Sequence, residues 1–307
     1  MAFSYPIEKD LLERKLATLR DKNWLPPELL TLISYTAHAQ LSNRAACPAP
    51  APLTLQKSDA HSQGAPLLDK EAFPVHFDMA ATLFTQLLDT MRTEGPLQEA
   101  ATHIYHTLQL AHGDATTALK PCFKAILHDD SDYFSPWAAA LPASPRLMHF
   151  LAYNSLVPSL STIAAEAYAP NHSLWQHGHC PVCGSAPFFG YIGKKSGKDH
   201  LKNLHDTNGQ RFHVCSFCRT EYRVKRLQCP FCLEEDHTKL EYFSLAEDSS
   251  YQVHVCHSCK SYIKIADFRE FSDRPVLPAL DDLACLPLDI AAQQQGFSRL
   301  TLSAWGF

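Results

Sequence analysis

Apolar residues recur at three- and four-residue steps through most of the first half of the chain, which is the spacing of one face of an α-helix. This spacing predicts helices over residues 11–19, 29–41, 77–91, 97–110, 115–127 and 146–168. We expect Pro158 to break or kink the last of them, because proline lacks a backbone N–H. The Ala-, Pro- and Ser-rich stretch from Cys47 to Pro66 is typical of a surface linker or long loop inside this helical half.

The pattern changes after Ser173, where cysteines, glycines and short β-prone runs replace the helical spacing. The runs cover residues 187–192, 239–245, 251–256 and 260–265. A helical pattern returns over residues 280–297 with Gly296 as its stop, and we expect this tail to pack on the helical half. The chain is therefore predicted to be α+β, with an all-α domain (1–171), two tandem β modules (172–226 and 227–272) and a C-terminal helical tail (273–307).

Charge and cysteine usage narrow the function classes. The net charge of -5 and the pI near 6.4 argue against a general binder of nucleic-acid backbones, which is normally basic. The charged N-terminal thirty residues lack the apolar core of a secretory signal, and no run of eighteen apolar residues predicts a membrane span. We therefore expect a cytoplasmic protein, in which eleven cysteines do not indicate disulfides.

Eight of the cysteines form four Cys-x-x-Cys pairs, and this spacing indicates metal binding. A two-residue gap lets both thiolates of a tight turn face one ion, and two such turns complete a tetrahedron around zinc or iron. Gly184, directly after the first pair, can adopt the positive φ of a metal-binding knuckle. The predicted ligands are Cys180, Cys183, Cys215, Cys218, Cys229, Cys232, Cys256 and Cys259.

An internal repeat predicts how the four pairs combine. Each copy begins with Cys-Pro-x-Cys and later contains His-Val-Cys-x-x-Cys before a β-prone strand, so the first and second pairs form one site and the third and fourth another. The gap in the first copy is 31 residues against 23, because it contains a polar loop over 194–209. The alternative joins Cys215/Cys218 to Cys229/Cys232 across ten residues, but an extended strand between them would hold the two pairs apart.

Other residues near the knuckles have simpler interpretations. Histidines 179, 213, 254 and 257 lie beside the cysteines and are either extra ligands or, as we favour, solvent-facing or supporting residues. Cys47, Cys122 and Cys285 lack metal spacing and are expected to fill the core. The basic run at 219, 223, 225 and 226 either offsets thiolate charge or contacts an acidic partner.

Several motifs together resemble the family of the formate dehydrogenase accessory protein FdhE. They are the segments 175–185, 211–232 and 255–264, in which Tyr222 replaces an expected tryptophan, and Leu288-Asp289-Ile290-Ala291 followed by Gly296-Phe297. The resemblance implies a helical domain joined to two rubredoxin-like or zinc-ribbon modules, with the eight cysteines as ligands and iron as the favoured metal. It also implies binding to the catalytic subunit of formate dehydrogenase before export. Among exposed groups, we expect Glu221 and Arg223 to contact this partner.

Three function classes fit these observations. An assembly and maturation factor for respiratory formate dehydrogenase is favoured, followed by a rubredoxin-like redox protein and a zinc-ribbon nucleic-acid adaptor. The sequence contains no nucleophile elbow, Walker A loop, dinucleotide-binding glycine motif or zinc-protease helix motif. We therefore predict no catalytic residues, no organic cofactor and no enzymatic activity.

Overall fold

The computed structural model describes residues 3–93, 95–111, 113–168, 174–193, 209–246, 248–269 and 276–306. Two compact units divide the chain, one of residues 1–55, 68–167 and 305–307 and the other of residues 56–67 and 168–304. The loop expected at 194–209 lies outside the described residues except for Gly209, and so do the residues at the expected boundaries 171/172 and 272/273. The predicted domain limits stay predictions.

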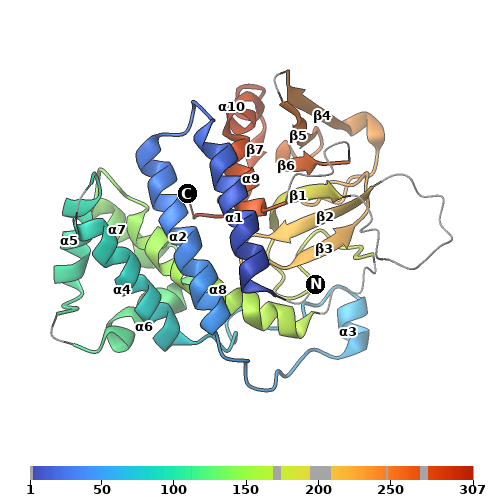
Figure 1. Cartoon of the computed structure of the whole chain (residues 1–307). Coiled ribbons are helices and arrows are strands. Elements are labelled where there is room, and N and C mark those ends of the chain that lie inside the picture. The colour runs from blue at the N-terminus through green and yellow to red at the C-terminus, as the bar shows by residue number, and fades with distance from the viewer. Residues whose placement is uncertain are drawn as a thin grey trace. The chain divides into compact units, whose positions relative to one another are not determined.

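The described part of the first unit is helical (Figure 1). Helix α8 is buried along most of its length and packs against α2, α4 and α6, because apolar residues surround it on nearly every side. Each of the six predicted helices is confirmed by an observed helix that overlaps it, although α5 ends at Thr107 rather than at residue 110. The elements are α1 (Tyr5–Arg20), α2 (Pro27–Ala46), α4 (Phe77–Thr93), α5 (Gln98–Thr107), α6 (Ala115–Leu127), η1 (Asp132–Phe134), α7 (Ser135–Ala140) and α8 (Leu147–Ala167).

Helix α8 continues through Pro158, so a break there is wrong, and the kink that we gave as the other outcome stays a prediction. Proline at this position leaves the carbonyl of Asn154 without its usual donor one turn later. The side chain of Gln40 on α2 donates to that carbonyl at 2.9 Å and to the Asn154 side chain at 3.0 Å. A neighbouring helix therefore satisfies the group that proline would otherwise leave unpaired. None of the described helices combines the length and apolar character needed to cross a bilayer.

The second unit contains one seven-stranded sheet (Figure 1). Six of its strands follow the order β3-β2-β1-β6-β5-β4, and β7 pairs with β6. Each sequence repeat supplies one antiparallel three-stranded group, and the two groups are joined where β1 pairs in parallel with β6. The strands are β1 (Pro187–Gly193), β2 (Gln210–Cys215), β3 (Glu221–Val224), β4 (Leu240–Leu245), β5 (Asp248–Cys256), β6 (Ser261–Asp267) and β7 (Ser298–Arg299), with η2 (His237–Lys239) before β4.

The C-terminal tail packs on this sheet, so the expectation that it packs on the helical half is wrong for residues 276–304. It forms two helices, α9 (Pro278–Ala284) and α10 (Leu286–Gln294), rather than one, because Cys285 and Pro287 interrupt the pattern. Helix α9 contacts β1, and α10 contacts β5 and β6. Gly296 ends the helical tail with a φ of 83°.

A buried group of charged side chains fixes the tail to the sheet. The ammonium of Lys264 on β6, 1% exposed, lies 2.8 Å from Asp282 and also pairs with Asp289. The guanidinium of Arg299 pairs with the same carboxylates at 2.9 and 3.3 Å. Tyr262 donates to Asp289 at 2.7 Å. Two cations and two carboxylates thus balance one another, which is the condition under which buried charges are tolerated.

Part of the presumed linker belongs to the second unit. Residues 56–67 contain the short helix α3 (Ser58–Ser62). The N–H of Leu67 donates to the Pro181 carbonyl at 2.9 Å, and the rings of His61 and Trp175 stack with centroids 4.8 Å apart. The segment is therefore part of the structure around the first cysteine knuckle.

Candidate metal centres

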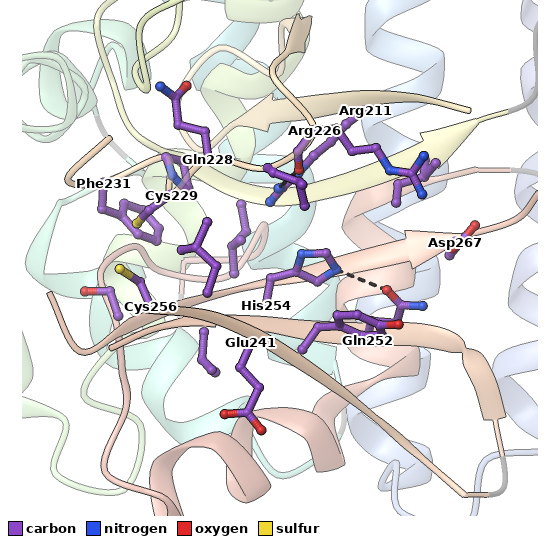
Figure 2. Close-up of a pocket in the computed structure, with 18 of the residues that line it drawn as sticks. Arg211, Arg226, Gln228, Cys229, Phe231, Glu241, Gln252, His254, Cys256 and Asp267 are labelled. Carbon is purple, nitrogen blue, oxygen red and sulfur yellow. Dashed lines mark hydrogen bonds between the residues drawn. The ribbon is translucent and has the colours of Figure 1, made fainter. Parts of the chain in front are cut away.

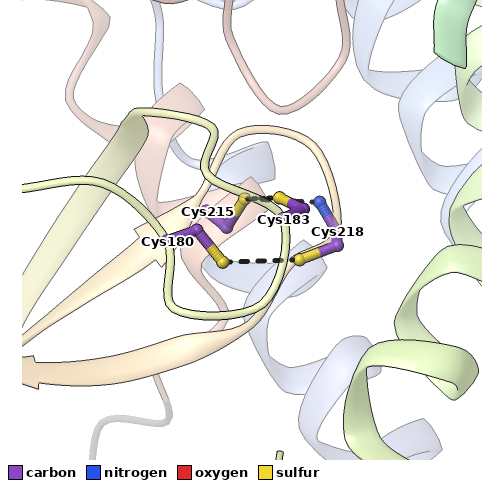
Figure 3. A group of neighbouring side chains, drawn as sticks. All are labelled: Cys180, Cys183, Cys215 and Cys218. Atoms are coloured by element: carbon purple, nitrogen blue, oxygen red, sulfur yellow. Dashed lines mark hydrogen bonds between the residues drawn. The ribbon is translucent and has the colours of Figure 1, made fainter. Parts of the chain in front are cut away.

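The first four-cysteine group lies where the β1–β2–β3 repeat closes on itself (Figure 3). Cys180 and Cys183 lie in the turn before β1, Cys215 ends β2, and Cys218 lies in the turn before β3. Their sulfurs are separated by 3.6 Å between Cys180 and Cys218 and by 3.4 Å between Cys183 and Cys215. All four side chains are buried. A tetrahedron with metal–sulfur bonds of about 2.3 Å has sulfur–sulfur edges of roughly 3.8 Å, so the group fits one zinc or iron ion.

Backbone groups of the first centre point toward its sulfurs. The N–H of Val182 lies 3.4 Å from the Cys180 sulfur, and those of Phe217 and Cys218 lie 3.3 and 3.4 Å from the Cys215 sulfur. Hydrogen bonds of this kind favour the thiolate, which is the form that binds metal. Burial raises the pKa of the Cys180 thiol, so a nearby cation is needed to hold this group ionised.

The second group repeats this arrangement at the β4–β5–β6 copy but is more open. The sulfurs of Cys229 and Cys259 are 3.7 Å apart, and those of Cys232 and Cys256 are 3.6 Å apart. Cys232 is exposed and Cys259 is half-buried, whereas every cysteine of the first group is buried. The two centres therefore share a geometry and differ in access from solvent.

The four knuckles share a backbone feature that the sequence indicated at only one of them. The residue after the second cysteine has a positive φ in each case, 76° at Gly184, 65° at Arg219, 62° at Leu233 and 57° at Lys260. Side chains other than glycine adopt this conformation at a cost of about 1 kcal/mol or more. From the sequence, a positive φ could be predicted only at Gly184, because arginine, leucine and lysine do not favour this conformation.

The structure brings the sulfurs together in the grouping that the internal repeat predicts. The alternative, in which Cys215 shares a site with Cys229, is wrong. The segment between these pairs forms a strand of only four residues, β3, shorter than the single ten-residue strand that we expected. The four cysteines of each site come from one sequence repeat, because the antiparallel strands of that repeat bring its two Cys-x-x-Cys turns together.

The remaining candidate residues lie outside both cysteine groups. A His179 ring nitrogen lies 2.8 Å from the Gly64 carbonyl, and His257 lies 3.0 Å from Glu241. His213 is buried with no hydrogen-bond partner among the described residues, and His254 contacts Gln252 at 3.0 Å.

The other cysteines and the expected partner-contact residues are also placed. Cys122 and Cys285 are buried, as expected, but Cys47 is half-exposed. Glu221 is exposed and accepts a hydrogen bond from the Tyr191 hydroxyl at 2.6 Å. Arg223 is half-buried rather than exposed as expected, and its carbonyl accepts from the Trp175 N–H at 2.9 Å. Partner contact by Glu221 and Arg223 stays a prediction.

Together, the fold and the two cysteine groups define a protein with a helical region followed by a sheet region of two tandem metal-binding modules. The family model described as FdhE, central domain, matches residues 179–226, and the model described as FdhE, C-terminal domain, matches residues 227–304. These matches over residues 179–304 support the FdhE family as the one to which the chain is similar.

Individual relatives agree with this assignment. The Aquifex aeolicus protein FdhE homolog is 33% identical over 164 residues, 53% of this chain and 54% of that protein. The Enterobacter homolog is 28% identical over 310 residues, 99% of this chain and 90% of that protein, and Escherichia coli protein FdhE is 28% identical over 309 residues with the same coverage. The crystal structure of the FdhE protein from Pseudomonas aeruginosa has the same fold, with a TM-score of 0.65 and 21% identity over 99% of this chain and 97% of that one.

Proposed function

We propose that this protein is a cytoplasmic assembly and maturation factor for respiratory formate dehydrogenase, and that it binds the catalytic subunit of that enzyme before export. The observation that carries the proposal is the pair of FdhE domain matches over the two cysteine modules. The function of formate dehydrogenase maturation comes from the resemblance of the sequence to the FdhE family.

We further propose that the eight cysteines hold two metal ions. Iron is favoured by the resemblance, and zinc has the same ligand preference and geometry. Four thiolates complete a tetrahedral shell and leave no position for a substrate. This ligand set supports a role in folding or partner binding and does not support Lewis-acid catalysis.

The partner contact is proposed to include Glu221 and Arg223 and to be salt-sensitive, because exposed charges steer association and are screened by ions. The test is to purify the full chain with the catalytic subunit of formate dehydrogenase at low and high salt and to measure metal in the same sample. Arg223→Gln should reduce recovery of the subunit, and Arg14→Gln on α1, where Arg14 pairs with Asp10 at 2.8 Å, is the matched control.

A deletion strain tests the proposed role in maturation directly. Cells without the protein should make formate dehydrogenase polypeptides that remain inactive, and a plasmid copy of the gene should restore activity. Full activity in the deletion strain under conditions that require formate respiration would contradict the proposal.

The exposure of Cys232 favours a second candidate, a redox protein that uses iron at the second centre. Electron exchange needs a metal near the surface, and the buried first centre lacks this access. An iron-loaded sample should then show a visible thiolate-to-iron absorption band that bleaches on reduction and returns on oxidation. A band that does not respond to reductant would exclude this candidate.

A further inference from the structure

A cavity of about 140 Å³ lies on one face of the joined sheet, between the two sequence repeats (Figure 2). Ile192 and Arg211 line it from the first repeat, and His254 and Ile263 line it from the second. Successive strand residues face opposite sides of a sheet. On β6, Lys264 binds the C-terminal helices, so its neighbour Ile263 faces away from them. The cavity therefore lies on the face opposite α9 and α10.

Two arginines at this cavity make no ion pair with a carboxylate of the described residues. The side chain of Arg211 is 3% exposed, and its Nη1 donates to the Arg226 carbonyl at 2.8 Å, while its Nε has no partner in the described part of the chain. The guanidinium of Arg226, which also lines the cavity, makes no hydrogen bond or ion pair with a described residue. A buried guanidinium without an anion is energetically unfavourable, so this side of the cavity favours negative charge.

The carboxylates at the cavity are already engaged elsewhere. Both oxygens of Asp267 accept hydrogen bonds from Arg269, at 2.8 and 2.7 Å. The Glu241 carboxylate lies 3.0 Å from the His257 ring. Burial opposes the ionisation of Asp267, but Arg269 and then Arg226 lower its pKa, so Asp267 offsets part of the Arg226 charge. Neither carboxylate pairs with the buried Arg211, which interacts with the thiol of Cys229, a proposed metal ligand that also lines the cavity.

The other wall of the cavity is apolar and small. Ile192 and Ile263 belong to one buried cluster against which Phe231 packs. Sites for drug-sized ligands have volumes of about 300–1000 Å³, and this cavity is well below that range at about 140 Å³. An apolar cavity of roughly 150 Å³ accepts a benzene-sized molecule. The volume suits a single ring or a single side chain and is too small for a nucleotide.

We propose that this cavity binds a carboxylate carried on a small apolar or aromatic group. Arg211 and Arg226 hold the carboxylate, and Ile192, Ile263 and Phe231 contact the apolar part. The carboxylate belongs either to a free small organic acid or to an acidic side chain of a partner protein. The site does not depend on the proposed role in formate dehydrogenase maturation, and its test uses no part of that enzyme.

The test is calorimetric titration of the full, metal-loaded chain with benzoate, its neutral analogue benzamide, and formate. We expect saturable binding of benzoate, at least tenfold weaker binding of benzamide because the charge is lost, and weaker binding of formate because the apolar part is lost. Arg226→Gln should weaken benzoate binding roughly tenfold, the loss of one charge-assisted contact. Lys225→Gln removes the same charge from a neighbour that pairs with Glu235 at 2.6 Å and does not line the cavity, so it should leave binding unchanged.

A capped Leu-Glu dipeptide and its Leu-Gln counterpart distinguish the two sources. Tighter binding of the Glu peptide than of benzoate indicates a partner side chain, and binding of benzoate alone indicates a free acid. The proposal is overturned if no carboxylate binds saturably, if benzamide binds as well as benzoate, or if the two charge variants behave alike. It is also overturned if Arg226→Gln lowers the metal content but not benzoate binding, since this arginine would then only offset the thiolate charge around Cys229.

Discussion

Replacing Lys264 tests whether the buried charges fix the C-terminal tail to the sheet. Lys264→Met keeps most of the side-chain volume but removes the cation that lies 2.8 Å from Asp282 and beside Asp289. Arg299 then pairs with both carboxylates without the help of Lys264. Removing one member of a buried ion pair costs about 3–5 kcal/mol, because the opposite charge stays buried without its partner. We expect a loss of this size.

Thermal unfolding of the metal-loaded chain measures the effect. For a unit of this size each kcal/mol shifts the Tm by about 2–4 °C, so the variant should unfold roughly 6–20 °C below the wild type. Lys239→Met is the matched control, because Lys239 is 51% exposed and lies 3.4 Å from Glu234. An exposed pair contributes less than about 1 kcal/mol, so the control should unfold close to the wild type.

The pH dependence of the loss gives a second readout. Burial opposes ionisation of Asp282, but Lys264 and Arg299 lower its pKa below the ordinary value. A carboxyl with a lowered folded-state pKa contributes stability above its unfolded pKa of about 3.9, and this contribution disappears as the pH falls through the folded value. In Lys264→Met the Asp282 carboxyl loses one of the two cations that lower its pKa and takes up a proton more readily. The loss of unfolding free energy relative to the wild type should therefore be full at pH 7 and smaller at pH 5.

A double variant completes the test. Adding Asp289→Asn to Lys264→Met removes the excess negative charge and should restore part of the lost stability. A Lys264→Met protein that unfolds within about 1 kcal/mol of the wild type, or a deficit that grows toward pH 5, would refute the reasoning.

Three further outcomes are expected. Gly178→Ala should destabilise the second unit by about 3 kcal/mol or more, because an added Cβ would lie 1.8 Å from the Pro230 carbonyl oxygen. Differential scanning calorimetry should show no comparable change for Gly113→Ala, whose Cβ would lie 3.8 Å from the Gln109 carbonyl oxygen. Chelator should remove metal faster from the second centre than from the first, so time-resolved metal release should be biphasic in the wild type and lose its fast phase in Cys232→Ser. Cys183→Ser should expose the first module to limited proteolysis while the helical unit resists cleavage, and wild-type resistance throughout would contradict a stabilising role for the metal.

Local sequence signals predicted much of the architecture. The helical spacing located six of the α-helices described in the first unit, although it missed the short α7. The repeat of Cys-Pro-x-Cys with His-Val-Cys-x-x-Cys predicted which sulfurs lie together. Both signals depend on residues near one another in the chain or on direct self-similarity. Both signals can therefore be recognised without knowledge of the tertiary structure.

The features that the sequence did not reveal depend on distant residues. Helix α8 passes through Pro158 because Gln40, more than a hundred residues earlier, donates to the carbonyl that proline leaves free. The tail packs on the sheet because Lys264 meets Asp282 and Asp289. The periodicity of α8 and of the C-terminal tail does not indicate these partners, because each contact forms only when the chain has folded.

The parallel pairing of β1 with β6 also sets an order in time. About 70 residues separate the end of β1 from the end of β6, so β1 leaves the ribosome long before the strand that covers its outer edge. At about 5–20 residues per second, this edge waits roughly 4–15 s during synthesis. An open strand edge is a template for pairing with other chains. The first repeat is therefore open to pairing with other chains until the second repeat has been synthesised and β6 has paired with β1.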